Sequence, residues 1–145
     1  MIHSRMFGAV LLYSLLSGLA GGTALSDTAT DLVGAFQVHS VSASAAPAGA
    51  CTKVQLMVDN ESRDDVQILG VSSDMATRAR ILANVGSRQP VALDSFIIPS
   101  GQSVEFSQSR WFELCGLTRS LAPGEAFAAE LRTPRWTSPL IVHVH

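Results

Sequence analysis

The sequence predicts an all-β protein, a single β-sandwich, and three observations lead to that fold class. Short apolar stretches recur along the chain and are separated by turn signals at intervals of about 8–12 residues. Several of these stretches alternate between apolar and polar residues, which is the pattern of a half-buried strand. No stretch after the amino terminus has the length and periodicity of a helix. Many short strands without helices are typical of a sandwich.

The clearest single element is the predicted strand Thr52–Asn60, where Val54, Leu56 and Val58 share one face. Polar residues occupy the positions between them, so one face is expected to lie on the core. The remaining predicted strands are less regular. In chain order, the predicted strands are Leu32–His39, Thr52–Asn60, Val66–Ser72, Arg78–Val85, Val91–Ile98, Ser103–Phe106, Trp111–Leu117, Ala126–Arg132 and Leu140–His145.

Ala126–Arg132 is the one predicted strand whose residues also favour a helix. It contains only seven residues, and Pro123-Gly124 and Pro134 bound it closely. A strand is therefore the better prediction. A second turn signal, Pro99-Ser100-Gly101, ends the stretch before Ser103–Phe106.

The first 26 residues have the composition of a secretory signal peptide. Arg5 gives a basic start, Met6–Ala20 is apolar, and Ala24-Leu25-Ser26 fits cleavage before Asp27. A membrane anchor is the alternative, but the uninterrupted apolar run is shorter than the ~20 residues that a spanning helix needs. We therefore expect an exported protein, periplasmic or secreted, with one domain over residues 27–145 and no anchor after cleavage.

Charge and motifs exclude several classes of function. Residues 27–145 carry nine basic and twelve acidic side chains, a net charge of −3, so binding to nucleic acid or anionic lipid is not expected. The sequence has no G-x-S-x-G, no phosphate-binding glycine loop and no dinucleotide fingerprint. The residues that enzymatic catalysis requires are not found together, which predicts a protein that is not an enzyme.

Two cysteines, Cys51 and Cys115, lie far apart in the sequence. In an exported protein they predict a structural disulfide. Two separate buried thiols are the next possibility. Thiolate metal ligands or a redox pair are a further alternative, which the lack of C-x-x-C spacing disfavours. Spacing alone does not decide among these.

One local sequence pattern indicates a metal-binding site. His143 and His145 are separated by one residue, so on a strand their imidazoles lie on the same face. Such a pair is able to bind copper, zinc or nickel if a third ligand joins it, and His39 is a candidate for that ligand. The alternative is an exposed carboxyl terminus where both histidines are without a role.

Several motifs, taken in order, resemble the periplasmic copper(I) chaperones of the PCu(A)C family. The resemblance extends over about Leu32–Val144. Its motifs, with the family pattern that each resembles, are Leu32–Val38 (the first strand), Val54–Ser62 (Y-x-x-I-x-N-x-G), Asp64–Ser73 (D-x-L-V-G-A-S-S), Ile98–Gly101 (I-P-A-G), and Leu114–Leu117 with Leu121–Glu125 (M-L-x-G-L…L-x-x-G-E). The resemblance implies a cupredoxin-like, Greek-key β-sandwich.

The family binds Cu(I) through a His-x10-Met-x21-His-x-Met pattern, and this sequence lacks those ligands. The corresponding positions are occupied by Leu82, Pro90, Trp111 and Glu113, and no His or Met occurs from Ala76 to Val142. The resemblance thus implies a copper-chaperone fold whose usual Cu(I) site is degenerate. Copper is the only cofactor it suggests.

Two functional hypotheses follow. The first is a non-enzymatic, copper-chaperone-like protein for copper handling or oxidase assembly, with another periplasmic or membrane-bound protein of that process as its partner. Any metal would then bind at His143 and His145. The second is a metal-independent interaction module that presents an apolar rim around Leu82, Trp111 and Phe112 to another exported protein.

Overall fold

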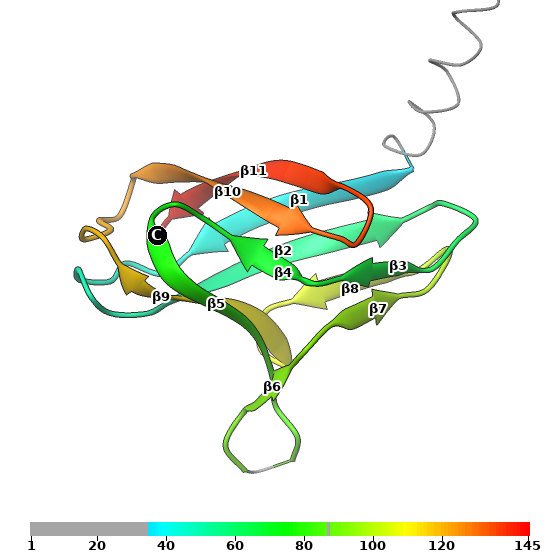
Figure 1. Ribbon diagram of the computed structural model, residues 1–145, viewed down its shortest axis with the longest axis horizontal. Coiled ribbons are helices and arrows are strands. Elements are labelled where there is room, and N and C mark those ends of the chain that lie inside the picture. Colours follow the sequence, from blue (N-terminus) through cyan, green and yellow to red (C-terminus); the bar gives the residue numbers. More distant parts are fainter. Residues whose placement is uncertain (1–34, 87) are drawn as a thin grey trace, which may run out of the picture. The chain divides into compact units, whose positions relative to one another are not determined.

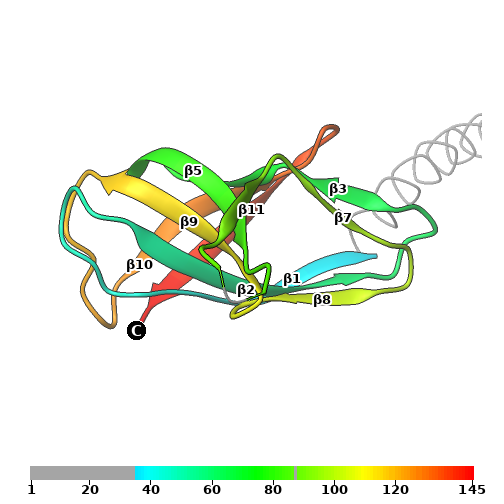
Figure 2. The same ribbon diagram turned by 90° about the horizontal axis from the view of Figure 1, so that it is seen from below.

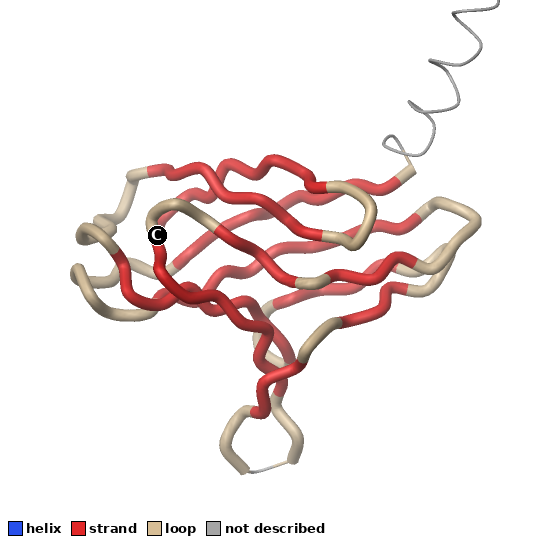
Figure 3. The backbone as a smooth tube through the Cα atoms, viewed as in Figure 1, coloured by secondary structure: helices blue, strands red, loops and turns tan. Residues whose placement is uncertain are grey.

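The computed structural model describes residues 35–86 and 88–145, and Phe36–His145 forms one unit within them. The predicted signal peptide, residues 1–26, and the predicted start of the domain at Asp27 lie outside the described residues. Those that are described form strands and loops, with no helix among them (Figure 3). None of these residues therefore belongs to a helix long and apolar enough to cross a membrane.

Eleven strands are found in the described part of the chain. They are β1 Phe36–Ala43, β2 Thr52–Asn60, β3 Val66–Ile68, β4 Gly70–Ser72, β5 Ala76–Ala83, β6 Val91–Leu93, β7 Phe96–Ile98, β8 Ser103–Phe106, β9 Arg110–Leu117, β10 Ala126–Arg132 and β11 Thr137–Val144.

Nine of these strands form one large, mostly antiparallel sheet (Figure 1). Its strand order is β4-β10-β11-β1-β2-β9-β5-β6, and β8 pairs with β2 outside this path. Only residues 73–75 separate β4, at one end of the path, from β5 near the other. The sheet must therefore curl around its own core, and Figure 2 shows this curl from below. The prediction of an all-β sandwich is confirmed.

Strand β2 lies at the centre of this arrangement. It pairs with β1 along one edge and with β8 and β9 on the other, all in antiparallel register. Val54, Leu56 and Val58 are at most 2% exposed, as their alternation predicts. The core that they join collects the apolar face of nearly every strand: Phe36, Ala43, Val54, Leu56, Val58, Ile68, Val71, Ile81, Ile98, Phe106, Phe112, Leu114, Leu117, Leu121, Phe127, Ala129, Leu131, Leu140, Val142 and Val144.

Two predicted strands are each broken in two. Val66–Ser72 divides at Leu69 into β3 and β4, and Val91–Ile98 divides into β6 and β7. In both cases the first and second halves belong to different sheets, because β3 pairs with β7 in a small two-stranded sheet while β4 and β6 belong to the large one. The chain bends where it changes sheet, and Gly70, with φ of 146°, lies at one of these bends.

Strand β10 is a regular strand, as predicted. It pairs with β11 on one side and β4 on the other, and its residues alternate between exposed and buried along their length. Strand β1, by contrast, continues past His39 into a segment predicted as loop. Its register with β2 shifts between His39 and Ser42, where Ser40 adopts a φ of 57°. This is a bulge, which sequence alternation does not reveal.

Candidate functional site

Three neighbouring strands, β2, β9 and β5, bring the chemically interesting residues together. Strand β9 places Phe112 and Leu114 in the core, so Trp111, Glu113 and Cys115 point to its other face. The register sets Glu113 between Lys53 of β2 and Arg80 of β5. The same register runs on to bring Cys51, just before β2, beside Cys115.

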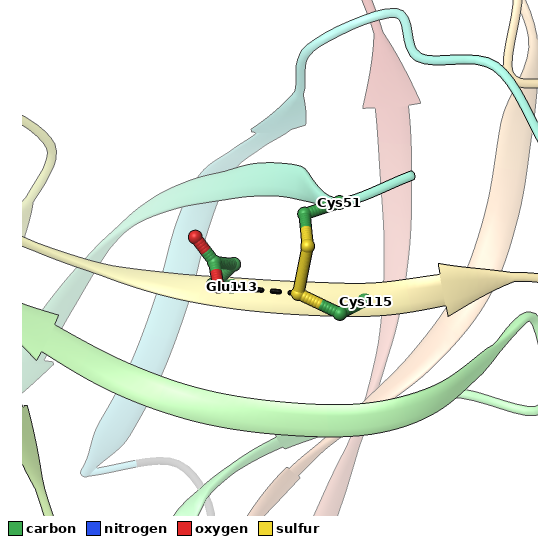
Figure 4. Close-up of side chains that lie close together, drawn as sticks. All are labelled: Cys51, Glu113 and Cys115. Carbon is green, nitrogen blue, oxygen red and sulfur yellow. Dashed lines mark hydrogen bonds between the residues drawn. A yellow bond between two sulfur atoms is a disulfide. The ribbon is translucent and has the colours of Figure 1, made fainter. Parts of the chain in front are cut away.

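Cys51 and Cys115 form a disulfide, with the two sulfur atoms 2.07 Å apart (Figure 4). This confirms the first of the alternatives left open by the sequence. Cys115 is buried in β9, whereas Cys51 is exposed immediately before β2 begins. The bond therefore joins an accessible half-cystine to a covered one.

Glu113 lies beside this disulfide and is fixed by Arg80. Its Oε1 atom accepts a hydrogen bond from Arg80 Nε at 2.8 Å and lies 2.7 Å from Arg80 Nη2. The same oxygen is 3.1 Å from Cys115 Sγ (Figure 4). A disulfide sulfur carries no proton, so this contact is a close approach in the oxidised protein; only a reduced thiol would donate to the carboxylate.

Cys51, Glu113 and Cys115 together offer three potential metal ligands whose donor atoms lie within 4.8 Å of one another. Among residues 35–86 and 88–145 this is the one group of three or more His, Cys, Asp or Glu side chains with such geometry. Thiolates are soft ligands that select Cu(I) and similar ions. As a disulfide the two sulfurs are not thiolates, so they could serve as thiolate ligands only after reduction.

The sequence points to all three residues separately. It places Glu113 at a substituted ligand position and predicts a disulfide between the cysteines. The sequence feature that connects two of them is their spacing: Glu113 and Cys115 are two residues apart, so both side chains lie on one face of a strand. What was missing was the β2–β9 register, which places Cys51 on the same face.

An open depression of about 370 Å³ lies over this group. Cys51 and Cys115 line it together with Arg78, Ala79 and Arg80 of β5. Two arginine residues thus border the depression, and the Glu113 carboxylate is paired with the guanidinium of Arg80. The setting is polar and cationic, in contrast to the apolar core on the other face of the same strands.

The positions that match the family's copper ligands are partly brought together. Leu82 of β5 lies directly opposite Trp111 of β9, and Glu113 is two residues further along the same face. Pro90 is exposed in the loop before β6. Leu82 is only 6% exposed, and Lys53 Nζ lies 4.5 Å from the centre of the Trp111 ring, so an apolar pair and a cation–π contact occupy this place.

The apolar rim expected around Leu82, Trp111 and Phe112 is not formed as predicted. Phe112 is fully buried, stacked on Phe106 with ring centroids 4.5 Å apart. Leu82 is buried as well, and Trp111 is only partly exposed. The rim prediction failed because a strand alternates its faces, so Phe112 must turn into the core when Trp111 turns outward.

His143 and His145 are both exposed, near the end of β11 and just beyond it. His143 lies opposite Ser42 and Ala126 in the sheet. Neither histidine belongs to a group of three potential ligands within the described part of the chain. His39 Nε2 lies 2.8 Å from Asp59 Oδ2 instead. Metal binding by the histidine pair stays a prediction.

Comparisons with known proteins bear on the fold. No model of a known family and no curated protein sequence matches the chain. Solved structures do match. The copper-bound PCuAC domain from PmoF2 superimposes with a TM-score of 0.66 at 14% identity, over 77% of this chain and 92% of that one. The chain has the fold of a PCuAC domain.

Two further solved structures have a similar fold. The apo PCuAC domain from PmoF1 gives a TM-score of 0.64 at 14% identity, covering 77% of this chain and 93% of that domain. The Cu(I) form of DR1885 from Deinococcus radiodurans gives 0.54 at 21% identity, covering 80% of this chain and 85% of that protein. The PCu(A)C resemblance stated from the sequence motifs is therefore confirmed at the level of the fold.

Proposed function

We propose that the protein is an exported, non-enzymatic, copper-chaperone-like protein in which the usual His/Met site for Cu(I) is absent. The observation that carries this proposal is the fold, which it shares with a domain solved with copper bound and with the Cu(I) form of DR1885. Its partner would be another periplasmic or membrane-bound protein of copper handling or oxidase assembly.

The residues at the matching positions support the loss of the usual site. Leu82, Trp111 and Glu113 share one face of β5 and β9, but a leucine and a tryptophan offer no ligand atom to copper. No His or Met between Ala76 and Val142 is available to replace them. The sandwich keeps its framework because the core lies on the opposite face of these strands.

Two places remain where copper would bind. His143 and His145 are the candidates in the protein as it stands, with the disulfide formed. Imidazoles suit Cu(II) as well as Cu(I). Cys51, Glu113 and Cys115 are the candidates once the disulfide is reduced. The alternative function, a metal-independent interaction module, has less support because Leu82 and Phe112 are buried.

Metal titration tests the proposal directly. The purified protein is titrated with Cu(I) and Cu(II) against a competing chelator, once with the disulfide intact and once after reduction. Binding in either state at micromolar affinity or better supports copper handling. Failure to bind either ion in both states contradicts it and leaves the interaction module.

The histidine pair has its own variant. If the oxidised protein binds copper, changing both His143 and His145 to Ala should abolish that binding. Binding that survives the double substitution would show that the pair is not the site. His39→Ala tests whether His39, which contacts Asp59 in the structure, is the third ligand; unchanged copper binding by this variant would show that it is not.

Export is tested separately from copper. The protein recovered from outside the cytoplasm is expected to begin at Asp27, because small residues at Ala24 and Ser26 suit cleavage there. Amino-terminal sequencing measures this. Recovery of an uncleaved chain from the cytoplasmic fraction would contradict it.

A further inference from the structure

The disulfide joins a more exposed cysteine to a more buried one. Cys51 is exposed in the segment that leads into β2, and Cys115 is 5% exposed within β9. Thiol–disulfide exchange proceeds by attack of a thiolate on an accessible sulfur. Attack at Cys51 would give a mixed disulfide there and release the Cys115 sulfur, which faces Glu113 Oε1 at 3.1 Å.

Reduction would leave a ready set of metal ligands. The two sulfurs and a Glu113 oxygen already lie within 4.8 Å of one another (Figure 4). Arg80 Nε donates a hydrogen bond to the same Glu113 Oε1 atom that faces Cys115, so the carboxylate is already positioned beside the sulfurs. Two thiolates from opposite strands with one carboxylate suit a soft monovalent ion better than a hard one, because the sulfur ligands dominate.

The surrounding charges offset those of the ligands. Two thiolates and a carboxylate carry three negative charges, and a bound Cu(I) leaves two. Arg78 and Arg80 border the depression, and Lys53 lies opposite Glu113 in the β2–β9 register. Nearby positive charge favours the thiolate form of a cysteine, so these three cations stabilise an anionic Cu(I) complex.

The framework that carries these ligands does not depend on the disulfide alone. Strands β2 and β9 pair through their backbones next to the cysteines. On the other face of the same strands, Val54, Phe112 and Leu114 are fully buried. A domain of this size is able to bury a core without cross-links, so the ligands would stay close after reduction.

We propose, resting on the copper-handling function above, that Cys51–Cys115 is a redox-controlled Cu(I) site with Glu113 as its third ligand. A dithiol reductant transfers two electrons and two protons to the disulfide, giving two thiols and the reductant's own disulfide. One Cu(I) then displaces the two thiol protons and binds to the sulfurs. Reoxidation of the sulfurs by a disulfide oxidant removes the thiolate ligands and releases the ion.

A chelator competition in the two redox states tests this inference. The full chain is reduced with a phosphine, the phosphine is removed without oxygen, and two free thiols are verified. Reduced and oxidised protein are then titrated with Cu(I) against bicinchoninate. The reduced form is expected to bind one equivalent roughly 100-fold more tightly than the oxidised form. Equal affinity in the two states overturns the inference.

Variants assign the ligands. Changing both Cys51 and Cys115 to Ser should make Cu(I) binding insensitive to the phosphine and leave it at the oxidised level. Glu113→Gln keeps both thiols and should weaken binding by the reduced form about 10- to 100-fold. Glu130 is an exposed carboxylate on β10, so Glu130→Gln is the matched control. It should leave the affinity of the reduced form for Cu(I) unchanged. Circular dichroism verifies that each variant is folded. If the double serine variant is not folded, the comparison of Glu113→Gln with Glu130→Gln still tests the site.

The outcomes separate this inference from the proposed function. If only the oxidised protein binds copper, and this binding is lost when His143 and His145 are changed to Ala, the proposed copper function is supported and the thiolate site is refuted. Tight Cu(I) binding by a folded double serine variant also refutes it. If neither redox state of the parent binds copper, the proposed function and this inference both fail.

Discussion

The role that the sequence suggests for Glu113 differs from the role that its neighbours in the structure suggest. In the sequence it stands where resembling proteins have a copper ligand, which suggests a lost site. In the structure its carboxylate is held between the Arg80 guanidinium and the Cys115 sulfur. A carboxylate held beside two cysteines is a potential ligand in its own right. In the proposed thiolate site, Glu113 would be a metal ligand of a different kind from the one in the resembling proteins.

Asp59 is a second residue whose surroundings alter its chemistry. Its Oδ1 accepts a 2.6 Å hydrogen bond from Ser103 Oγ, and its Oδ2 lies 2.8 Å from His39 Nε2. These bonds, the one from Ser103 first, hold the pKa of Asp59 below its ordinary value of 3.8. Because the folded-state pKa is lowered, the carboxylate favours the folded state above about pH 4, and this is lost as the pH falls through the folded pKa.

Ser103→Ala tests this cause. The substitution removes the stronger of the two bonds, so the pKa of Asp59 should rise toward 3.8. A carboxyl-carbon NMR titration measures it. Ser109→Ala, in the loop between β8 and β9, is the matched control. An unchanged Asp59 pKa in the Ser103 variant would show that His39 alone sets it.

Gly116 is required where it stands, next to the disulfide in β9. Its φ is 65°, and a Cβ added there would lie 2.0 Å from Thr77 Oγ1 on the facing strand. Gly116→Ala is therefore expected to lower the free energy of unfolding by about 2 kcal/mol or more, from the left-handed backbone and the clash together. Urea denaturation measures the loss.

A double substitution separates the two contributions. Thr77→Ala removes the clashing hydroxyl, so Gly116→Ala should cost less in that background, with the backbone term of about 1–2 kcal/mol remaining. An equal cost in both backgrounds would show that the contact with Thr77 is relieved by a small shift of the strand.

At the scale of elements, the strands that the sequence predicted best are those with a turn at each end. Thr52–Asn60, Ser103–Phe106 and Ala126–Arg132 have the predicted bounds. Period-2 burial is a local property, so a local pattern reveals it. The breaks at Leu69 and between β6 and β7 escaped prediction, because they depend on which sheet each half joins.

The candidate site was predictable only in part for the same reason. The disulfide was expected, and the shared face of Glu113 and Cys115 follows from their spacing. The approach of Cys51, Lys53 and Arg80 to that face depends on the register of β2, β9 and β5. The register between two strands that are distant in sequence cannot be predicted from the residues of either strand alone.

Asn60 connects several elements at the end of β2 and is fully buried. Its Nδ2 donates to the carbonyls of Asp64 and Ile98, both at 2.9 Å. Its Oδ1 accepts from the Ser62 backbone N–H at 3.1 Å and the Ser62 hydroxyl at 2.6 Å. The amide thus ties β2 to the following turn and to β7, with its bonding capacity filled.

Asn60→Ala should therefore destabilise the fold more than an ordinary polar substitution. It leaves buried groups such as the Ile98 carbonyl without a partner, and the free energy of unfolding is expected to fall by about 3 kcal/mol. Asn84→Ala, which removes one exposed bond to the Gln108 carbonyl, is the control and should cost well under half as much. Chemical denaturation of the pair measures both, and equal losses would contradict the connecting role.

At the scale of the whole molecule, the disulfide stabilises the fold, and it also keeps the two sulfurs from serving as thiolate ligands. It links positions 64 residues apart, and in the chain-entropy model such a bond stabilises the fold by about 4 kcal/mol. Reduction should lower the free energy of unfolding by about that amount, measured by urea denaturation with and without a phosphine. The double Ser variant at Cys51 and Cys115 should show no response to the phosphine. An unchanged parent midpoint would contradict the estimate.

The same reduction that weakens the fold would open the metal site. Binding of Cu(I) to the folded, reduced form would restore part of the lost stability, because a ligand that binds only the native state stabilises it. If the proposed site binds Cu(I), redox state, metal binding and stability would be linked through Cys51 and Cys115.

X-ray absorption at the copper edge of the reduced, Cu(I)-loaded protein tests the central claim most directly. If Cys51 and Cys115 bind the ion as proposed, two sulfur atoms will dominate the nearest coordination shell of the copper. A shell of nitrogen atoms, with the outer scattering of imidazole rings, would place copper on His143 and His145 and contradict it.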